Sequence, residues 1–212
     1  MEFKIKQTLS IQLANATVKG DLIIPEKAKS IVIFSHGSGS SRLSPRNREV
    51  AEFLHGGNMG TLLFDLLTPT EDAIPENRFD IKLLTVRLIA VTQWLEKQPD
   101  VKGCSIGYFG ASTGAAAALA AAAQLPQIAA VVSRGGRPDL AGDALPLVKA
   151  PTLLIVGSLD YHVLILNQQS LERLGGTCKL EMVLGATHLF EEPGKMREVE
   201  QLAADWFRKY LP

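Results

Sequence analysis

One serine in this chain lies in a pattern that is typical of an activated nucleophile. Residues 110–114 are Gly-Ala-Ser-Thr-Gly, which matches G-x-S-x-G with Ser112 at its centre. A short apolar run precedes the pattern at residues 106–109, and an alanine-rich run follows it. Because alanine favours helix, the segment predicts a strand, a tight turn and a helix with Ser112 at the apex. This is the context of a nucleophile elbow, in which a strained turn exposes the serine hydroxyl.

A serine hydroxyl needs a general base, and histidine suits that role because its pKa lies near neutral pH. We predict His188 as the base, since it follows a predicted strand late in the chain. A carboxylate must then fix the orientation of the histidine. Asp160 follows another predicted strand, between the serine and the histidine in the sequence. The order Ser112, Asp160, His188 is the one expected for a serine on a strand–turn–helix elbow.

The acid has alternatives. Asp160 could be an ordinary N-cap of the helix expected to begin near Tyr161, and the capping and catalytic roles are compatible. Asp139 is a rival acid because it comes just after a different predicted strand. Asp65, at the end of the predicted strand 61–64, is a weaker rival.

The base also has rivals among the other histidines. His55 lies near a helix end, where a cation at the C-terminus is a sufficient explanation. His162 opens a predicted helix and is expected to be exposed. His36 precedes a glycine at the end of a predicted strand, and we expect it to brace that loop rather than transfer protons.

Acyl transfer also needs hydrogen-bond donors for the negative charge that develops on the carbonyl oxygen. One donor is expected to be the backbone N–H of Thr113, directly after the nucleophile. The other should come from the loop after the predicted strand 31–35. The backbone N–H of Ser38 is the first choice there, with Gly37 beside it.

Two loops at the predicted active edge carry arginines, which can hold a carboxylate or phosphate in bidentate fashion. Arg42 lies in the loop after strand 31–35, and Arg134 lies at the end of strand 128–133. Together with Gly37, they are the candidates for substrate contact. The alternative is that these arginines pair with local acids such as Asp139 or Glu49, or face water.

The elements that must position these residues alternate along the chain. Apolar and β-branched runs predict strands at 3–9, 13–24, 31–35, 61–64, 106–109, 128–133, 152–156 and 179–183. Helices are predicted at 45–54, along the alanine-rich run ending at 123, and at 79–97, 163–174 and 193–210. The polar stretch 68–77 is predicted to be a mobile loop.

This alternation predicts an α/β fold with a mostly parallel central sheet and helices on both faces. Two antiparallel strands open the chain, and residues 1–212 are expected to form one domain without a cap insertion. Ligands bind outside the carboxyl ends of strands in such sheets. The candidate residues all follow strands, so the topology should bring them to one edge.

Composition narrows the class of protein. Lysine plus arginine (22) balances aspartate plus glutamate (22), so no overall charge favours nucleic acid or a membrane surface. Neither a signal peptide nor a membrane-spanning run is predicted. The two cysteines, Cys104 and Cys178, are far apart and have no metal-ligand spacing, so they are expected to be buried thiols. A cytoplasmic protein without nucleic-acid or membrane partners is expected.

Four blocks of the sequence resemble those of the α/β-hydrolases. They are Ser-His-Gly-Ser-Gly at 35–39, the elbow block at 107–114, Gly-Ser-Leu-Asp at 157–160 and Gly-Ala-Thr-His-Leu-Phe at 185–190. The small size and the absence of a cap make the chain most similar to the dienelactone-hydrolase-like branch. Dienelactone hydrolases carry cysteine as the nucleophile, whereas this chain has Ser112. The resemblance implies a serine esterase that needs no cofactor or metal.

The leading hypothesis is therefore a serine hydrolase that cleaves a small or medium carboxylic ester or lactone through an acyl-enzyme. Its partner would be a small-molecule ester. An acyltransferase or a peptidase could use the same triad. A non-catalytic binding protein that keeps the fold is the alternative from another class.

Overall fold

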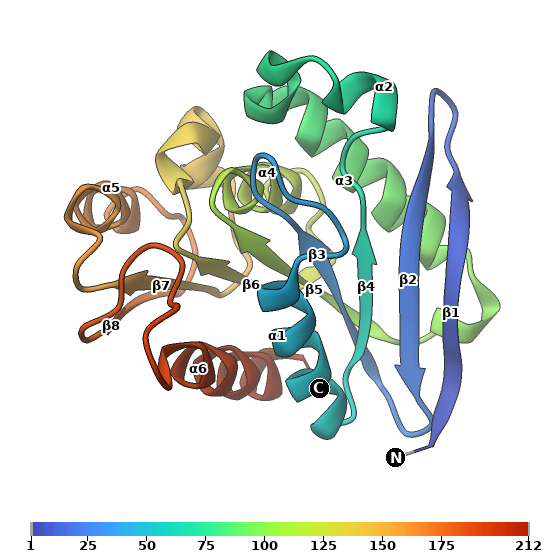
Figure 1. Cartoon of the computed structure of the whole chain (residues 1–212). Helices are drawn as coiled ribbons and strands as arrows, with labels where there is room; N and C mark the ends of the chain where they lie inside the picture. The colour runs from blue at the N-terminus through green and yellow to red at the C-terminus, as the bar shows by residue number, and fades with distance from the viewer. Residues whose placement is uncertain (1, 212) are drawn as a thin grey trace.

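The computed structural model describes residues 2–211, which form one eight-stranded sheet between two layers of helices (Figure 1). The strands are β1 (Phe3–Gln12), β2 (Thr17–Pro25), β3 (Ser30–Ser35), β4 (Gly60–Phe64), β5 (Ser105–Ala111), β6 (Ile128–Arg134), β7 (Thr152–Gly157) and β8 (Cys178–Val183). Their order across the sheet is β1-β2-β4-β3-β5-β6-β7-β8.

The sheet is parallel from β4 to β8 and antiparallel at its other end. β1 pairs with β2 antiparallel, and β2 pairs antiparallel with β4. Every other neighbouring pair is parallel. The predicted mostly parallel sheet with two antiparallel opening strands is confirmed.

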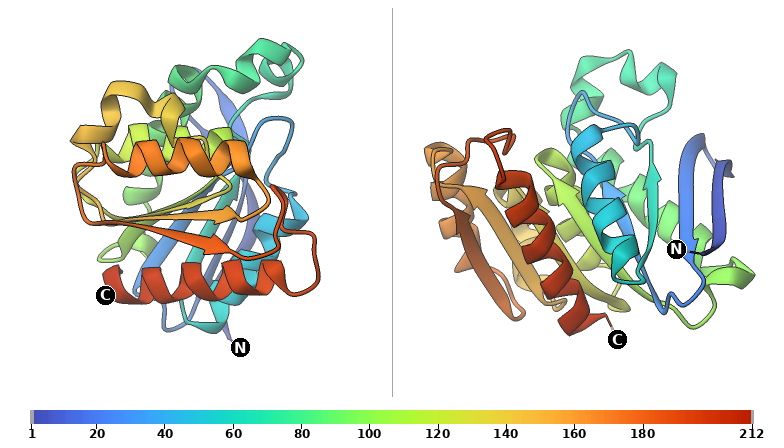
Figure 2. Two further views of the ribbon diagram at one scale, coloured as in Figure 1. Left: turned by 90° about the vertical axis from the view of Figure 1, so that its left-hand side faces the viewer. Right: turned by 60° about the horizontal axis from the view of Figure 1, so that its bottom comes forward.

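The helices cover both faces of the sheet, as predicted (Figure 2). The helices are α1 (Pro45–Gly56), α2 (Pro69–Asp72), α3 (Ile81–Glu96), α4 (Thr113–Ala122), α5 (Tyr161–Leu171) and α6 (Lys195–Tyr210). α1 and α6 share one hydrophobic core with one face of the sheet, and α3 and α4 share a second core with the other face. No helix within residues 2–211 is long and apolar enough to cross a membrane.

The sequence explains why these elements form. All residues of β3 and of β7 are buried, which fits their uninterrupted apolar runs. Ser44 caps α1 by accepting a hydrogen bond from the Asn47 backbone N–H, and Pro45 takes the first helical position. Along α4 the small side chains of residues 115–118 are fully buried, so this helix packs closely onto the sheet.

The polar stretch 68–77, predicted to be a mobile loop, is largely helical. It contains α2 and most of a short 3₁₀ helix at Pro75–Phe79. Thr68 and Glu71 form a reciprocal capping box around α2, and the Glu71 carboxylate also accepts a hydrogen bond from Arg87 at 2.7 Å. These local bonds give the stretch helical structure despite its polar composition.

Other predictions need smaller corrections. Residues 13–16 form a turn, so β2 begins only at Thr17. α3 begins at Ile81, where Asp80 caps it, and α5 ends at Leu171, earlier than predicted. Two further 3₁₀ helices, Pro99–Val101 and Pro138–Leu147, were not predicted. Both cysteines are free thiols, but they are half-buried rather than fully buried.

Candidate active site

Ser112 occupies the apex of a sharp turn between β5 and α4. Its backbone has φ 51° and ψ −122°, a conformation that side-chain-bearing residues adopt only when the surroundings hold it. A Cβ at Gly110 would lie 2.5 Å from the Cα of Ala115, and one at Gly114 would collide with the carbonyl oxygen of Ser35. Only glycine fits these two positions, and the predicted strand, tight turn and helix are confirmed.

His188 and Asp160 meet across two neighbouring loops. His188 lies in the loop after β8 and Asp160 in the loop after β7, and His188 Nδ1 is 2.6 Å from Asp160 Oδ2. Although Asp160 is the residue before α5, its side chain makes no capping hydrogen bond. Its carboxylate is therefore free to hold the imidazole, and the capping alternative does not account for it.

A single loop, residues 134–137, connects the serine to the histidine. The Ser112 N–H donates to the carbonyl of Arg134 at 3.3 Å, and the Arg137 N–H donates to the carbonyl of Ser112 at 3.1 Å. A Cβ at Gly135 would lie 3.5 Å from His188 Nδ1. The structure thus brings the three predicted residues to the same edge of the sheet, at the carboxyl ends of β5, β7 and β8.

The site is reachable from solvent. Ser112 is half-buried, the His188 side chain is 39% exposed, and the Asp160 side chain is 14% exposed. This gradient places the carboxylate innermost and the imidazole between it and the surface. Such an arrangement suits a carboxylate that orients the base rather than one that contacts substrate.

The rival acids have other partners. The Asp139 carboxylate accepts two hydrogen bonds from Arg137, at 2.9 and 2.8 Å. The Asp65 carboxylate accepts one from the Arg42 side chain at 2.8 Å and one from the Arg42 backbone N–H at 2.9 Å. Each is satisfied by an arginine close to it in the fold.

His36 is buried and bonded to the backbone on both sides of its ring. Its Nε2 lies 3.0 Å from the Leu66 backbone nitrogen, and its Nδ1 lies 2.9 Å from the Gly37 carbonyl oxygen. The Leu66 N–H can only donate, so Nε2 accepts and Nδ1 carries the proton. Burial lowers the pKa of His36 below its ordinary value and so favours this neutral form. These contacts support the predicted bracing role.

The remaining histidines lie elsewhere. His55, in α1, is buried with its Nε2 2.8 Å from the Thr61 hydroxyl. Burial, followed by the charge of Lys6, lowers the pKa of His55 to about 4. His162 is exposed, as predicted. Within residues 2–211 neither is bonded to a carboxylate, whereas His188 has the partner that a general base needs.

The two residues predicted to form the oxyanion site contact each other. The Ser38 N–H donates to the Thr113 side-chain Oγ1 at 2.9 Å. The Thr113 N–H has no hydrogen-bond partner within residues 2–211. Gly37 borders Ser112, because a Cβ on Gly37 would lie 3.1 Å from the Cβ of Ser112. The predicted loop therefore lies beside Ser112, but the Ser38 amide is directed to a side chain.

The two candidate arginines are engaged within the fold. Besides Asp65, Arg42 faces Asp21 at 3.7 Å, which agrees with the alternative of local acid pairing. Arg134 is only 7% exposed, and its guanidinium donates to Asn47 Oδ1 at 3.3 Å. Burial, followed by the nearby charge of Arg46, lowers the pKa of Arg134 to about 10. Substrate contact by either arginine stays a prediction.

Two supporting residues were not predicted. Arg137 holds the Ser112 carbonyl through its backbone, which no sequence pattern could indicate. The Glu192 carboxylate accepts hydrogen bonds from the backbone N–H of Thr187 at 3.1 Å and from its hydroxyl at 2.6 Å. These hydrogen bonds, that of the hydroxyl above all, lower the pKa of Glu192. Glu192 thereby fixes the residue before His188.

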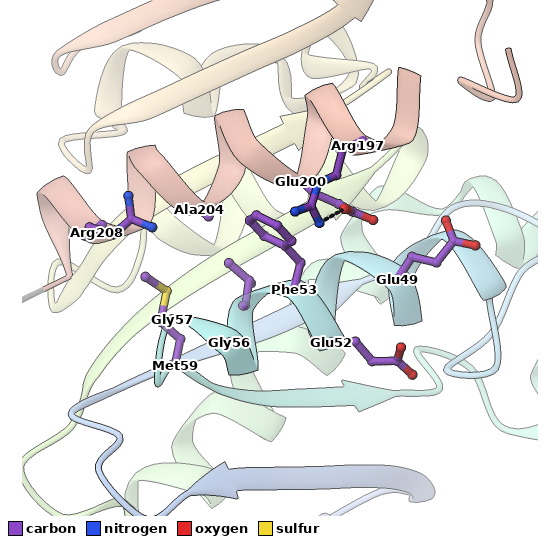
Figure 3. A pocket seen from close by; sticks show the side chains of 11 residues that line it. Glu49, Glu52, Phe53, Gly56, Gly57, Met59, Arg197, Glu200, Ala204 and Arg208 are labelled. Atoms are coloured by element: carbon purple, nitrogen blue, oxygen red, sulfur yellow. Dashed lines mark hydrogen bonds and ion pairs between the residues drawn. The ribbon is translucent and has the colours of Figure 1, made fainter. Parts of the chain in front are cut away.

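Two surface hollows lie away from the three predicted catalytic residues, and Arg42 lines the second of them. One of about 580 Å³ runs between α1 and α6, where the Arg197 guanidinium lies 4.2 Å from the centre of the Phe53 ring and pairs with Glu200 (Figure 3). Another of about 660 Å³ lies beside β1, β2 and α1. Neither is lined by Ser112, Asp160 or His188. In residues 2–211, no group of three or more histidine, cysteine or acidic side chains is arranged to hold a metal ion.

Comparison with solved structures places this geometry in a family. A dienelactone hydrolase from Anabaena variabilis is 51% identical, and the match covers 100% of both chains with a TM-score of 0.96. The chain belongs to the dienelactone hydrolase family of α/β-hydrolases. The esterase Est1E from Butyrivibrio proteoclasticus shares the fold of this family, with a TM-score of 0.81 at 16% identity over 95% of this chain and 98% of that one.

A family model and two curated proteins also match this chain. A family model described as the C-terminal region of BAAT and acyl-CoA thioester hydrolases matches residues 90–162. Two proteins of Mycobacterium tuberculosis, with the provisional name phosphoribosyl transferase, are 60% identical over 195 residues. The match covers 92% of this chain and 44% of each of those proteins. The chain thus spans less than half the length of these curated relatives.

Proposed function

We propose that this chain is a serine hydrolase that cleaves small or medium carboxylic esters, including lactones, through an acyl-enzyme. The observation that carries the proposal is the 2.6 Å contact between His188 Nδ1 and an Asp160 carboxylate that caps nothing. A carboxylate held in this way fixes the tautomer that leaves Nε2 free to accept a proton. A strained serine at the same sheet edge completes the set of groups that acyl transfer needs.

The reaction follows from the roles of these groups. Ser112 Oγ attacks the carbonyl carbon while its proton passes to His188 Nε2, and the carbonyl oxygen becomes negatively charged. Asp160 stabilises the imidazolium that forms. Collapse of the intermediate breaks the ester bond, and the alcohol leaves with the proton from His188. Water, deprotonated by His188, then attacks the acyl-enzyme, and the acid and free Ser112 are released.

The surroundings of the triad favour substrates with apolar parts. Leu159 and Tyr161, on either side of Asp160, are exposed, and so is Leu189 after His188. Exposed apolar side chains that cluster in sequence around catalytic residues offer a surface for an acyl or alcohol group. The dienelactone hydrolase name of the Anabaena protein adds lactones, which are cyclic esters, to the substrates worth testing.

A thioester is the second candidate substrate. The match to the BAAT and acyl-CoA thioester hydrolase model covers residues 90–162, which include both Ser112 and Asp160. The same triad would open a thioester or pass the acyl group to a nucleophile other than water, including an amine. Phosphoribosyl transfer is not proposed, because an elbow serine with a histidine base serves acyl transfer.

Labelling with a fluorophosphonate, followed by peptide mapping, tests the nucleophile directly. We expect wild-type protein to be labelled at Ser112 alone and Ser112→Ala to remain unlabelled. Ser133→Ala is the matched control, because Ser133 is a buried serine on β6 and should not affect labelling. A folded wild-type protein that takes no label would rule out the triad and favour a binding protein of this fold.

Turnover separates the substrate classes. Short-chain p-nitrophenyl esters, lactones and acyl-CoA thioesters should be compared by kcat/KM, with Ser112→Ala as the blank. Hydrolysis of oxygen esters above thioesters is expected. A preference for acyl-CoA would transfer the proposal to thioesters while leaving the catalytic residues unchanged.

A further inference from the structure

The hydroxyl of Thr113 is the acceptor of the Ser38 N–H, the amide that was predicted to bind the substrate oxyanion. A substrate oxygen accepting from the Ser38 N–H would have to lie about 2.7–3.1 Å from that nitrogen. Thr113 Oγ1 is already there, at 2.9 Å from the Ser38 nitrogen. Thr113 is 4% exposed whereas Ser38 is exposed, so this contact lies at the border between the buried elbow and solvent. The Ser38 amide is therefore committed to a side chain in the resting protein.

A hydroxyl that accepts one hydrogen bond still has its own proton to donate. Within residues 2–211, no acceptor for the Thr113 hydroxyl proton is found, and the Thr113 backbone N–H also lacks a partner. Two donors on one residue, directly after the nucleophile, are thus unpaired. Accepting a bond from Ser38 makes the hydroxyl a stronger donor, because linked hydrogen bonds polarise one another.

We propose that the Thr113 side-chain hydroxyl is itself a catalytic residue of this site, donating to the substrate oxyanion together with the Thr113 backbone N–H. The Ser38 N–H then acts one bond away, by orienting and polarising the hydroxyl. The assignment rests on the proposed acyl-transfer function. The position of the Ser38 amide follows from Gly37, which borders Ser112 closely and places the next residue beside the elbow.

A rival arrangement predicts the opposite effect of removing the hydroxyl. If the Ser38 N–H bound the oxyanion directly, the hydroxyl would compete with the substrate for that amide. Thr113→Val would then free the amide and leave the reaction unchanged or faster. If the hydroxyl is the donor, the same substitution removes it and slows the reaction.

The rate at which a fluorophosphonate labels Ser112, followed by intact mass, distinguishes these arrangements without knowledge of the substrate. Phosphonylation also places negative charge on an oxygen in the oxyanion site. We expect Thr113→Val to slow labelling by about 10²-fold, the usual effect of losing one oxyanion donor, and Thr113→Ser to stay within about fivefold of wild type. Thr85→Val is the matched control, because Thr85 is an equally buried threonine in α3, away from the site.

A second pair of variants tests the proposal in case Thr113→Val does not fold. Thr113→Ser and Thr113→Ala differ only by the hydroxyl, so their ratio of labelling rates carries the proposal even if valine does not fit. With an ester substrate, kcat should fall and KM stay constant, since the bond forms only as charge develops.

The labelling rates test the hydroxyl assignment separately from the serine hydrolase proposal. Labelling of Thr113→Val and Thr113→Ala at the wild-type rate or faster would overturn the hydroxyl assignment and leave the serine hydrolase proposal intact. A folded wild-type protein that is never labelled would overturn both. A slow Thr113→Ala beside a fast Thr113→Ser supports the hydroxyl as donor.

Discussion

Two histidines lie at the same edge of the sheet, and their surroundings give them different roles. His36 follows β3, is buried, and bonds backbone groups through both ring nitrogens. His188 follows β8, is 39% exposed, and has a carboxylate on Nδ1. The two residues share type and topological position, but only His188 has the partner and the access to solvent that proton transfer needs.

This difference separates a structural histidine from the one proposed as the general base. Burial without a carboxylate lowers the pKa of His36 and keeps it neutral, so it serves as a fixed hydrogen-bonding bridge. A carboxylate on one nitrogen of a half-exposed ring leaves the other nitrogen free to gain and lose a proton. Substitution should therefore affect mainly activity at His188 and mainly stability at His36.

The largest effect is expected from His188→Gln. Glutamine can still hydrogen-bond Asp160 but cannot accept the proton of Ser112, so kcat/KM for a p-nitrophenyl ester should fall by about 10⁴-fold or more. The free energy of unfolding should change by less than about 1 kcal/mol, because the side chain is half-exposed. His162→Gln, at an exposed histidine two residues after Asp160, should retain full activity. Near-normal turnover by folded His188→Gln would exclude His188 as the base.

A smaller effect, on stability rather than chemistry, is expected at His36. His36→Leu removes the acceptor of the buried Leu66 N–H, which should cost about 1–3 kcal/mol in urea unfolding. His36→Gln offers an amide oxygen to the same N–H, so it should lose less stability than the leucine variant and stay within about tenfold of wild-type activity. Loss of activity in His36→Gln as severe as in His188→Gln would mean that both histidines take part in proton transfer.

Much of this contrast could be predicted from the sequence. The strands are continuous apolar runs, and His36, Asp160 and His188 each follow one, so topology alone brings them to one edge. The elbow glycines were also predictable, because Gly110 and Gly114 leave room that no side chain could share. These are features in which local pattern and global fold agree.

Partners across loops could not be predicted in the same way. An arginine paired with Asp139 was an alternative from the sequence, and Arg137, two residues away, is its partner. That Asp65 pairs with Arg42 depends instead on a distance between side chains that spacing does not fix. The burial of Arg134 is also unexpected, since arginines are seldom buried without a carboxylate partner.

The prediction for residues 68–77 was wrong for a different reason, because the sequence contains a pattern that indicates helix. Thr68-Pro69-Thr70-Glu71 has the T-x-x-E pattern of a capping box, with proline at the first helical position. Polar composition and two prolines favoured a loop instead. Local capping chemistry outweighed composition here, and the ion pair from Glu71 to Arg87 ties the stretch to α3.

The smallest expected effect is a pH dependence of the stability that His36 contributes. Burial lowers the pKa of His36 below its ordinary value of 6.5, against the opposing charges of Asp65 and Asp72. Below pH 6.5 the unfolded chain therefore binds a proton at this residue that the folded chain does not. Stability from His36 is then complete above pH 6.5 and decreases as the pH falls through that value. His55, whose pKa is lowered to about 4, acts in the same direction.

Glutamine does not titrate, and the carboxylates and His55 are the same in both proteins. The difference in unfolding free energy between wild type and His36→Gln therefore isolates the pH dependence that comes from His36. We expect wild-type protein to exceed the variant in unfolding free energy at pH 7, and the gap to narrow progressively at pH 6 and pH 5. Urea unfolding at the three pH values measures it. A gap that stays constant or widens on acidification would mean that folded His36 takes up a proton as readily as the unfolded chain does. The distinction between a neutral bridge at His36 and a proton-transferring base at His188 would then fail.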